Sequence, residues 1–344
     1  MSGGPRTPAG RAGILGTGHA VPATTRDGSD PVYQHLDLGV GATGESEAAL
    51  FTGAGERRAL ADGESLEPLM LEACRQALGS AGVAPEKIDR LYGYASVPEY
   101  FTPNPLYRIH QHLGLRPDAL VVPINSDFSN FLQGVLHAHE SIEAGSSENA
   151  LVVTGSSWTR NLDYTRGHAQ AASDGAGAAV VGVGGRLTVV DHASFTDGSA
   201  FESMTMGVRP RHAPGWSGIP LGHGGAPIPT YLMDPDLGMR VYGTIMWDGL
   251  PDLVDELLAR HGLTGADTAL ITHQGSRQLL DHWSERIRPA QYFETLSTLG
   301  NLTNATYPVN LAVHLDQVSA PYLVIAAVGT GFHLTALLLQ NRSA

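Results

Sequence analysis

The residue types that most often carry covalent or metal chemistry are scarce or poorly spaced in this chain. Cys74 is the single cysteine among 344 residues, which excludes a disulfide framework, a Cys-x-x-Cys redox motif and a cysteine-rich zinc site. Two histidine pairs, His110/His112 and His137/His139, suggest a metal ligand set. Residues i and i+2 do not share a helix face, and no carboxylate completes either pair. No metal and no cofactor are expected.

Four short glycine-containing segments, in a fixed order along the chain, form a more specific pattern. They are 173–178 (SDGAGA), 272–275 (THQG), 300–308 (GNLTNATYP) and 328–332 (VGTGF). These segments resemble the GDGAGA, HQAN and GNTSAASIP motifs and the last glycine turn of the thiolase-like condensing enzymes, closest to the ketoacyl-acyl-carrier-protein synthase III group. One such match alone would be weak, but four in the right order make a specific resemblance, which extends over about residues 13–340.

The resemblance implies roles for several residues. His273 and Asn301 match the His and Asn that hydrogen-bond a thioester carbonyl and stabilise the enolate left by decarboxylation. His273 is also expected to act as a general base where an acceptor must lose a proton. Thr330 and Gly331 match the place where the family supplies an oxyanion N–H, and Asp174 matches a structural position of the fold.

The chain departs from the family at the nucleophile. The family's cysteine starts a buried helix within a pattern like N-x-x-C-x-G-F, and the corresponding segment 123–131 reads PINSDFSNF. Matching Asn125 on one side and Phe131 on the other places Phe128 at the nucleophile position. A benzyl group cannot attack a thioester, and Cys74 belongs to a different helix. The usual acyl-cysteine stage is therefore not expected.

Three functions remain open at this point. The favoured one is a ketoacyl synthase III-like acyltransferase of specialised metabolism, which moves an acyl group directly from a carrier thioester to an acceptor with His273 as base. In the second, Ser126 or Ser129 replaces the thiol, although serine needs an adjacent base and Ser126 is also a good helix N-cap. In the third, the chain decarboxylates a malonyl thioester or is a silent partner of a cysteine-bearing relative.

The elements that would position these residues recur along the chain. A helix over about 65–81 precedes a strand over 88–94, and a helix over 252–262 precedes a strand over 268–272 that ends at His273. The same combination of helix, glycine turn and buried strand therefore occurs twice, roughly 180 residues apart.

A second pair of segments supports the repeat. Residues 150–155 and 322–327 are continuous apolar strands, which are typical of sheets covered on both faces. The sequence predicts an α/β protein of two similar halves, and the resemblance makes it a thiolase-like duplicated five-layer αβαβα architecture. The expected divisions are a flexible leader 1–12, an N-terminal half 13–185 and a C-terminal half 186–344, with a long insertion or lid loop over 205–235.

Composition limits the partners. The formal charge is −13 and only 16% of residues are charged, so nucleic-acid binding and disorder are both disfavoured. No apolar run long enough to cross a membrane and no signal-peptide h-region occur, which predicts a cytoplasmic protein.

The resemblance also implies a thioester donor, either acyl carrier protein or coenzyme A, and a small-molecule acceptor. Carrier docking needs a local basic patch, for which Arg209, Arg211 and Arg277 are the candidates. Some relatives stack an early Trp on the coenzyme A adenine, and its absence here favours a carrier protein. A homodimer is expected through the strand near 148–155, or a heterodimer if the chain is a silent partner.

Overall fold

The computed structural model describes residues 12–39, 46–100, 102–207 and 229–343. Its centre is a continuous order of ten hydrogen-bonded strands, which divides into two five-stranded sheets. The first sheet has the order β5-β4-β6-β7-β1 and the second the order β12-β11-β13-β14-β8. The first sheet contains β1 (Ala12–Ala20), β4 (Arg90–Ser96), β5 (Leu120–Pro123), β6 (Asn149–Ser156) and β7 (Gly175–Val183). The second contains β8 (Leu187–Thr196), β11 (Thr268–Thr272), β12 (Gln291–Phe293), β13 (Tyr322–Gly329) and β14 (His333–Asn341).

The two sheets repeat one topology. In the first, β4 runs parallel to β5 and β6, while β7 is antiparallel to β6 and β1. In the second, β11 runs parallel to β12 and β13, while β14 is antiparallel to β13 and β8. The sheets meet at β1 and β8, which pair at only two positions, Gly13 with Thr188 and Ile14 with Leu187. The duplicated α/β architecture predicted from the sequence is therefore present.

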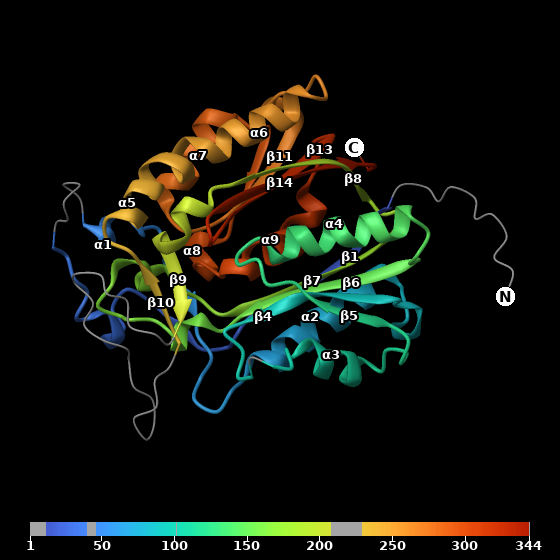
Figure 1. Ribbon diagram of the computed structural model, residues 1–344, viewed down its shortest axis with the longest axis horizontal. Coiled ribbons are helices and arrows are strands. Elements are labelled where there is room, and N and C mark those ends of the chain that lie inside the picture. The colour runs from blue at the N-terminus through green and yellow to red at the C-terminus, as the bar shows by residue number, and fades with distance from the viewer. Residues whose placement is uncertain (1–11, 40–45, 101, 208–228, 344) are drawn as a thin grey trace, which may run out of the picture.

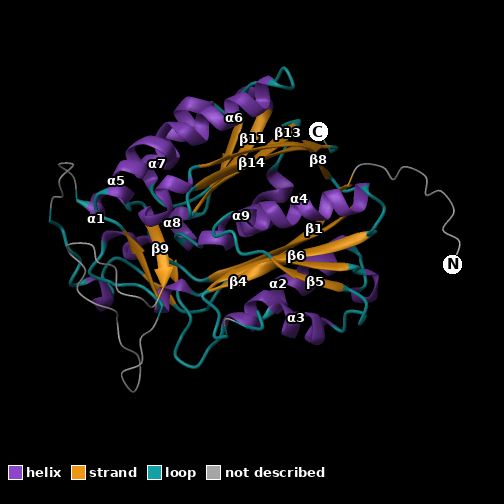
Figure 2. Cartoon of the chain, in the orientation of Figure 1, coloured by secondary structure: helices purple, strands orange, loops and turns teal. Residues whose placement is uncertain are grey.

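Helices alternate with the sheets to give five layers (Figure 1). The first sheet is covered on its outer face by α2 (Leu66–Ala81) and α3 (Leu106–Leu113), and the second by α6 (Leu250–Ala259) and α7 (Arg277–Ile287). Between the sheets lie α4 (Asn130–Glu143) and α9 (Thr306–His314). Figure 2 shows the same succession of helix and strand layers. The two central helices begin at the end of the molecule where the candidate site residues gather.

Smaller elements close that end. They are β2 (Thr25–Arg26) paired with β3 (Arg57–Arg58), β9 (Met204–Gly207) paired with β10 (Thr230–Met233), and the short helices α1 (Glu47–Leu50), α5 (Leu237–Val241) and α8 (Leu296–Leu299). A π-helix, Tyr242–Gly249, continues α5 into α6. Of the predicted insertion 205–235, the two ends form the β9/β10 pair, and residues 208–228 lie outside the described part.

The element boundaries agree closely with the repeat read from the sequence. The strand expected at 268–272 is β11, and the helix expected at 65–81 is α2, which begins after Ser65. The predicted leader 1–12 lies outside the described residues apart from Ala12, the first residue of β1. Within the described ranges, none of the helices combines the length and the apolar character that crossing a bilayer requires.

One expectation about assembly is wrong. The strand near 148–155 is β6, and both of its edges are already hydrogen-bonded, to β4 and to β7. It cannot continue the sheet into a second subunit, because a strand offers backbone groups to a new neighbour only from a free edge. The edge strand of the first sheet is β5, whose Leu120 is exposed.

Candidate active site

His273 lies directly after the buried strand β11, at the carboxyl end of the second sheet. Its backbone N–H donates to the Ala326 carbonyl on β13 at 3.1 Å, and its side chain is 4% exposed. Burial lowers the pKa of His273 to about 4, so the imidazole is neutral near pH 7. The Tyr307 hydroxyl on α9 lies 3.3 Å from His273 Nδ1. Tyr307 was not singled out in the sequence, because no local pattern connects it to the imidazole 34 residues away.

Asn301 is held in place by the opposite half of the chain. It follows Gly300, whose φ of +67° suits a residue without a Cβ. The Asn301 N–H donates to the Ala171 carbonyl at 2.7 Å, and its carbonyl accepts from the Ser173 N–H at 3.0 Å. Its side-chain oxygen accepts from the Thr303 N–H at 2.9 Å, which fixes the carboxamide orientation.

Gln274 stabilises the same loop from the THQG segment. Its side-chain oxygen accepts from the Thr295 N–H at 2.6 Å and from Asn310 Nδ2 at 3.0 Å. Gln274 is fully buried, so these bonds replace water contacts that the amide would otherwise lose. The residue after His273 therefore supports the loop that carries Asn301.

Phe128 lies against the imidazole. Its ring stacks on His273 with a centroid distance of 5.5 Å and an interplanar angle of 7°, and it is 8% exposed. The residue stands just before α4, at the point to which the sequence register assigned the family's nucleophile. An aromatic ring thus occupies the space beside His273.

The two serines that flank Phe128 have other neighbours. Ser126 Oγ accepts from Gln133 Nε2 at 2.8 Å and lies 3.3 Å from His333 Nε2, while Ser129 Oγ lies 2.9 Å from the same nitrogen. A base adjacent to serine therefore exists, but it is His333. Neither serine lines the cavity that contains His273, so the contacts do not support Ser126 as a surrogate nucleophile.

The contacts of Thr330 correct its expected role. Its N–H and its hydroxyl both donate to the Asp127 carbonyl, the hydroxyl at 2.7 Å. The Thr330 N–H is therefore already used and is not available to an oxyanion. The oxyanion assignment of Gly331 stays a prediction.

A mostly apolar cavity of about 30 Å³ joins the candidate residues. Its polar side chains include His273, Asn301 and His168, and its apolar wall includes Phe128 and Tyr231. We call it the His273 chamber. Within the described ranges, no three His, Cys, Asp or Glu side chains are grouped closely enough to hold a metal ion.

A second cavity, of about 40 Å³, shares Phe128 with this chamber and is lined by Asp127. Ser96 Oγ donates to Asp127 Oδ2 at 2.8 Å, while Oδ1 is buried and has no hydrogen-bond partner among the described residues. Burial raises the pKa of Asp127 to about 6. No local sequence pattern distinguishes Asp127, because its side chain acquires this environment only through folding.

Replacing Asp127 by asparagine is expected to stabilise the protein at neutral pH. The native state holds the Asp127 proton to a higher pH than the unfolded chain, so its contribution to stability falls as pH rises from about 4 to about 6 and is lowest above that window. Asp127→Asn removes this dependence and should raise the free energy of unfolding by about 1–3 kcal/mol near pH 7.5. Thermal unfolding of the wild type and of Asp127→Asn at both ends of this pH window measures the difference in their stability, which should vanish near pH 4.

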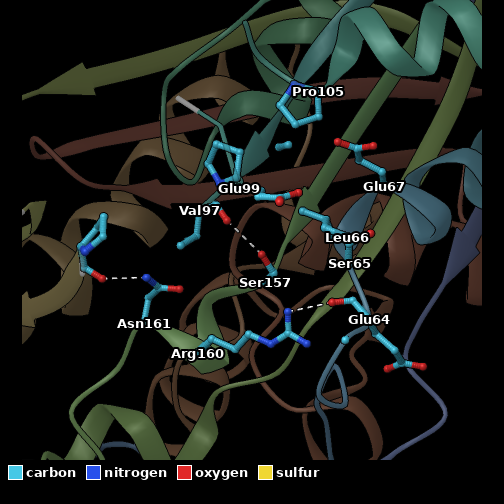
Figure 3. A pocket seen from close by; sticks show the side chains of 14 residues that line it. Glu64, Ser65, Leu66, Glu67, Val97, Glu99, Pro105, Ser157, Arg160 and Asn161 are labelled. Carbon is cyan, nitrogen blue, oxygen red and sulfur yellow. Dashed lines mark hydrogen bonds between the residues drawn. The ribbon is translucent and has the colours of Figure 1, made fainter. Parts of the chain in front are cut away.

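A larger pocket of about 650 Å³ opens at the surface nearby (Figure 3). Hydrogen bonds order its wall: Ser157 Oγ donates to the Val97 carbonyl at 3.0 Å and an Arg160 nitrogen donates to the Glu64 carbonyl at 2.8 Å. Val97 lines both this pocket and the Asp127 cavity. The pocket therefore adjoins the site but contains neither His273 nor Asn301.

The predicted carrier-binding arginines receive little support. Arg277 pairs with Glu294 at 2.7 Å and with Asp281 at 3.5 Å, so its charge is largely neutralised within the chain. Arg209 and Arg211 lie outside the described residues.

Comparisons with known proteins agree with the fold. The sequence profile of the 3-oxoacyl-(acyl-carrier-protein) synthase III family matches residues 124–198. The β-ketoacyl-(acyl-carrier-protein) synthase III of Rhodospirillum centenum is 27% identical over 341 residues, covering 96% of this chain and 99% of that protein. The corresponding protein of Nitratidesulfovibrio vulgaris is 27% identical over 301 residues, covering 84% and 87%.

Solved structures show the same architecture. A priming β-ketosynthase of a polyketide biosynthetic pathway superposes with a TM-score of 0.80 at 24% identity, covering 98% of this chain and 99% of that one. The 3-oxoacyl-(acyl carrier protein) synthase III of Pseudomonas aeruginosa gives a TM-score of 0.77 at 23% identity, covering 96% and 98%. The predicted thiolase-like fold is confirmed.

Proposed function

Because the chain is a ketoacyl synthase III-like relative of the thiolase-fold condensing enzymes, we propose that it is an acyltransferase without a covalent acyl-enzyme stage. It moves an acyl group from a carrier thioester directly to a small-molecule acceptor. The observation that carries this proposal is the stack of Phe128 on His273, with Asn301 in the same chamber. The groups that can polarise a thioester are present, and a ring fills the space beside them.

The chemistry follows from the hydrogen bonds of His273. The Tyr307 oxygen lies 3.3 Å from His273 Nδ1, and we assign the Tyr307 hydroxyl as the donor in this contact. This arrangement favours the neutral tautomer with its proton on Nε2. His273 Nε2 and Asn301 Nδ2 then donate to the thioester carbonyl oxygen as negative charge develops on it. A pKa of about 4 makes His273 a weak base, so we assign it the role of donor.

A direct test combines turnover with intact mass. The pure protein is incubated with acyl thioesters of carrier protein or of coenzyme A and a panel of acceptors. We expect release of the free thiol and an acylated acceptor, with no mass added to the protein. A stable adduct would overturn the non-covalent route. Absence of turnover together with co-purification of a cysteine-bearing relative would favour the silent-partner function.

Decarboxylation is a second candidate function, because the same two donors can stabilise the enolate of a malonyl thioester. Release of CO₂ from malonyl thioester without any acceptor measures it. We further propose that the chain acts in specialised metabolism in the cytoplasm, with no nucleic-acid or membrane partner.

We also propose that the protein forms a homodimer through the free edge of β5. Leu120 is exposed on that edge. A lysine at this position would disfavour pairing of β5 with a strand of a second subunit. Leu120→Lys is expected to shift the protein from dimer to monomer, as light scattering after size exclusion measures. Val313→Lys, at an exposed position on α9, is the matched control and should leave the mass unchanged. A wild-type monomer would contradict the proposal.

A further inference from the structure

A second imidazole lines the His273 chamber. His168 is 2% exposed, and its Nδ1 lies 2.6 Å from Glu47 Oε1 on α1. The His168 backbone N–H donates to the same oxygen at 3.1 Å. The other carboxylate oxygen, Glu47 Oε2, accepts from Arg166 Nε at 3.0 Å. These bonds fix the position of the carboxylate and of the ring.

Glu47 is a carboxylate at any working pH. Burial alone would raise the pKa of Glu47, but the hydrogen bonds from His168 and the nearby Arg166 charge hold it at about 2. A carboxylate only accepts hydrogen bonds, so the His168 proton lies on Nδ1. In the neutral form of the ring, the lone pair is then on Nε2.

His168 Nε2 is buried and has no hydrogen-bond partner in the described part of the chain. Buried side-chain nitrogens are usually satisfied, and an exception calls for an explanation such as a catalytic role or a bound ligand. His168 lines the chamber that also contains His273 and Asn301. A ligand in this chamber is the simplest partner for the unsatisfied nitrogen.

The local sequence is built to bring the two residues together. Gly167 lies so close to α1 that a Cβ there would collide with the backbone of Glu47 and Ala48. The Gln170 side chain also donates to the Ala48 carbonyl, and Ser46 caps α1 by accepting from the Ala49 N–H at 3.2 Å. These contacts tie the four-residue helix to the segment that carries His168.

We propose that His168, oriented by Glu47, is the general base that deprotonates a hydroxyl acceptor, so that the product is an ester. This inference rests on the proposed acyl transfer. A carbanion acceptor made by decarboxylation needs no base, and a neutral amine attacks through its lone pair. A hydroxyl must lose its proton as it attacks, and His168 Nε2 can take it. The two histidines thus have different roles. His273 donates a hydrogen bond to the thioester carbonyl, and His168 takes the proton of the acceptor hydroxyl.

The step balances as follows. The hydroxyl proton moves to His168 Nε2 while the acceptor oxygen bonds to the thioester carbon. The carbonyl electron pair moves to the oxygen held by His273 and Asn301. When the carbonyl re-forms, the C–S bond breaks with its electron pair on sulfur. The His168 imidazolium, stabilised by the Glu47 carboxylate, returns the proton to the thiolate, giving one ester and one free thiol.

The experiment compares two nucleophiles in the same chamber. Acyl transfer to a panel of alcohols and to hydroxylamine, which attacks without first losing a proton, is measured for the wild type and for His168→Gln. We expect transfer to alcohols to fall about 10²–10⁴-fold, and transfer to hydroxylamine to fall much less. His137→Gln replaces an exposed histidine and is the matched control. Equal losses with both nucleophiles, or unchanged transfer to alcohols, would overturn the base role.

Two further measurements keep this inference separate from the proposed function. In His168→Gly, added imidazole should restore transfer to alcohols, whereas a purely structural role predicts no rescue. If the wild type transfers acyl groups to neither nucleophile, the proposed acyl transfer fails. The ¹⁵N spectra of His168 then test separately whether Glu47 holds the His168 proton on Nδ1. An unprotonated Nε2 that becomes a tautomeric mixture in Glu47→Gln supports the base assignment; a protonated Nε2 in the wild type overturns it.

Discussion

Replacing Phe128 by cysteine is expected to give the protein a covalent acyl-enzyme stage that the wild type lacks in the proposed mechanism. The ring stands 5.5 Å from the His273 ring, so a thiol at this position would lie beside an imidazole and close to Asn301. The thiol would also stand just before the N-terminus of α4, where the thiolate that attacks a thioester is favoured. We expect the mass of the variant to increase by one acyl group at near full occupancy after incubation with an acyl thioester, while the wild type shows no increase. Intact-mass spectrometry followed by peptide mapping measures this.

Phe128→Ala is the matched control, because it empties the same space without adding a nucleophile. Either change removes a buried aromatic ring, and the alanine variant should lose about 3–5 kcal/mol of stability, so thermal unfolding must first show that both proteins are folded. Cys74 serves as an internal control, since burial raises the pKa of its thiol and keeps it unreactive. An acyl group on Cys74, or no adduct on the folded cysteine variant, would contradict our placement of the site.

His273→Ala is expected to lower kcat/KM for acyl transfer by about 10²–10³-fold, the usual loss when one donor to a developing oxyanion is removed. The reason is that His273 Nε2 and Asn301 Nδ2 share the thioester carbonyl oxygen in the proposed geometry. Release of free thiol, followed with a chromogenic disulfide at saturating acceptor, measures the loss. Asn301→Ala should give a loss of the same order.

His273→Gln distinguishes a donor from a base. A glutamine side chain can still donate an N–H to the carbonyl but cannot accept a proton at neutral pH. We therefore expect it to retain at least about tenfold more activity than His273→Ala. If both variants are equally inactive, His273 acts as the base, as the family resemblance alone implied, and His168 loses that role.

The sheets and the main helices were predictable because their signals are local. Apolar strands such as 150–155 and 322–327 are buried on both faces, and this burial is visible in the sequence as a continuous run of aliphatic residues. His273 and Asn301 could also be selected from the sequence, because each stands at a fixed place in a glycine-containing motif. The four-residue helix α1 escaped notice, since it is too short to show a period.

The parts of the site that were missed depend on contacts between distant segments. Glu47 and His168 are 121 residues apart, and the sequence around either residue does not predict their contact. The Thr330 N–H was expected to serve an oxyanion, but the Asp127 carbonyl 203 residues away takes it. The role of β6 was misjudged for a similar reason, because strand order is set by the packing of the whole sheet rather than by the strand's own residues.

The carboxamide of Asn301 comes from one half of the chain, while its backbone is held by Ala171 and Ser173 of the other. Each half also supplies one of the two imidazoles of the chamber, His168 and His273. The proposed catalysis would therefore require both halves of the chain together. Two fragments divided between β7 and β8 would each be inert, and recovered turnover on mixing them would report their reassembly.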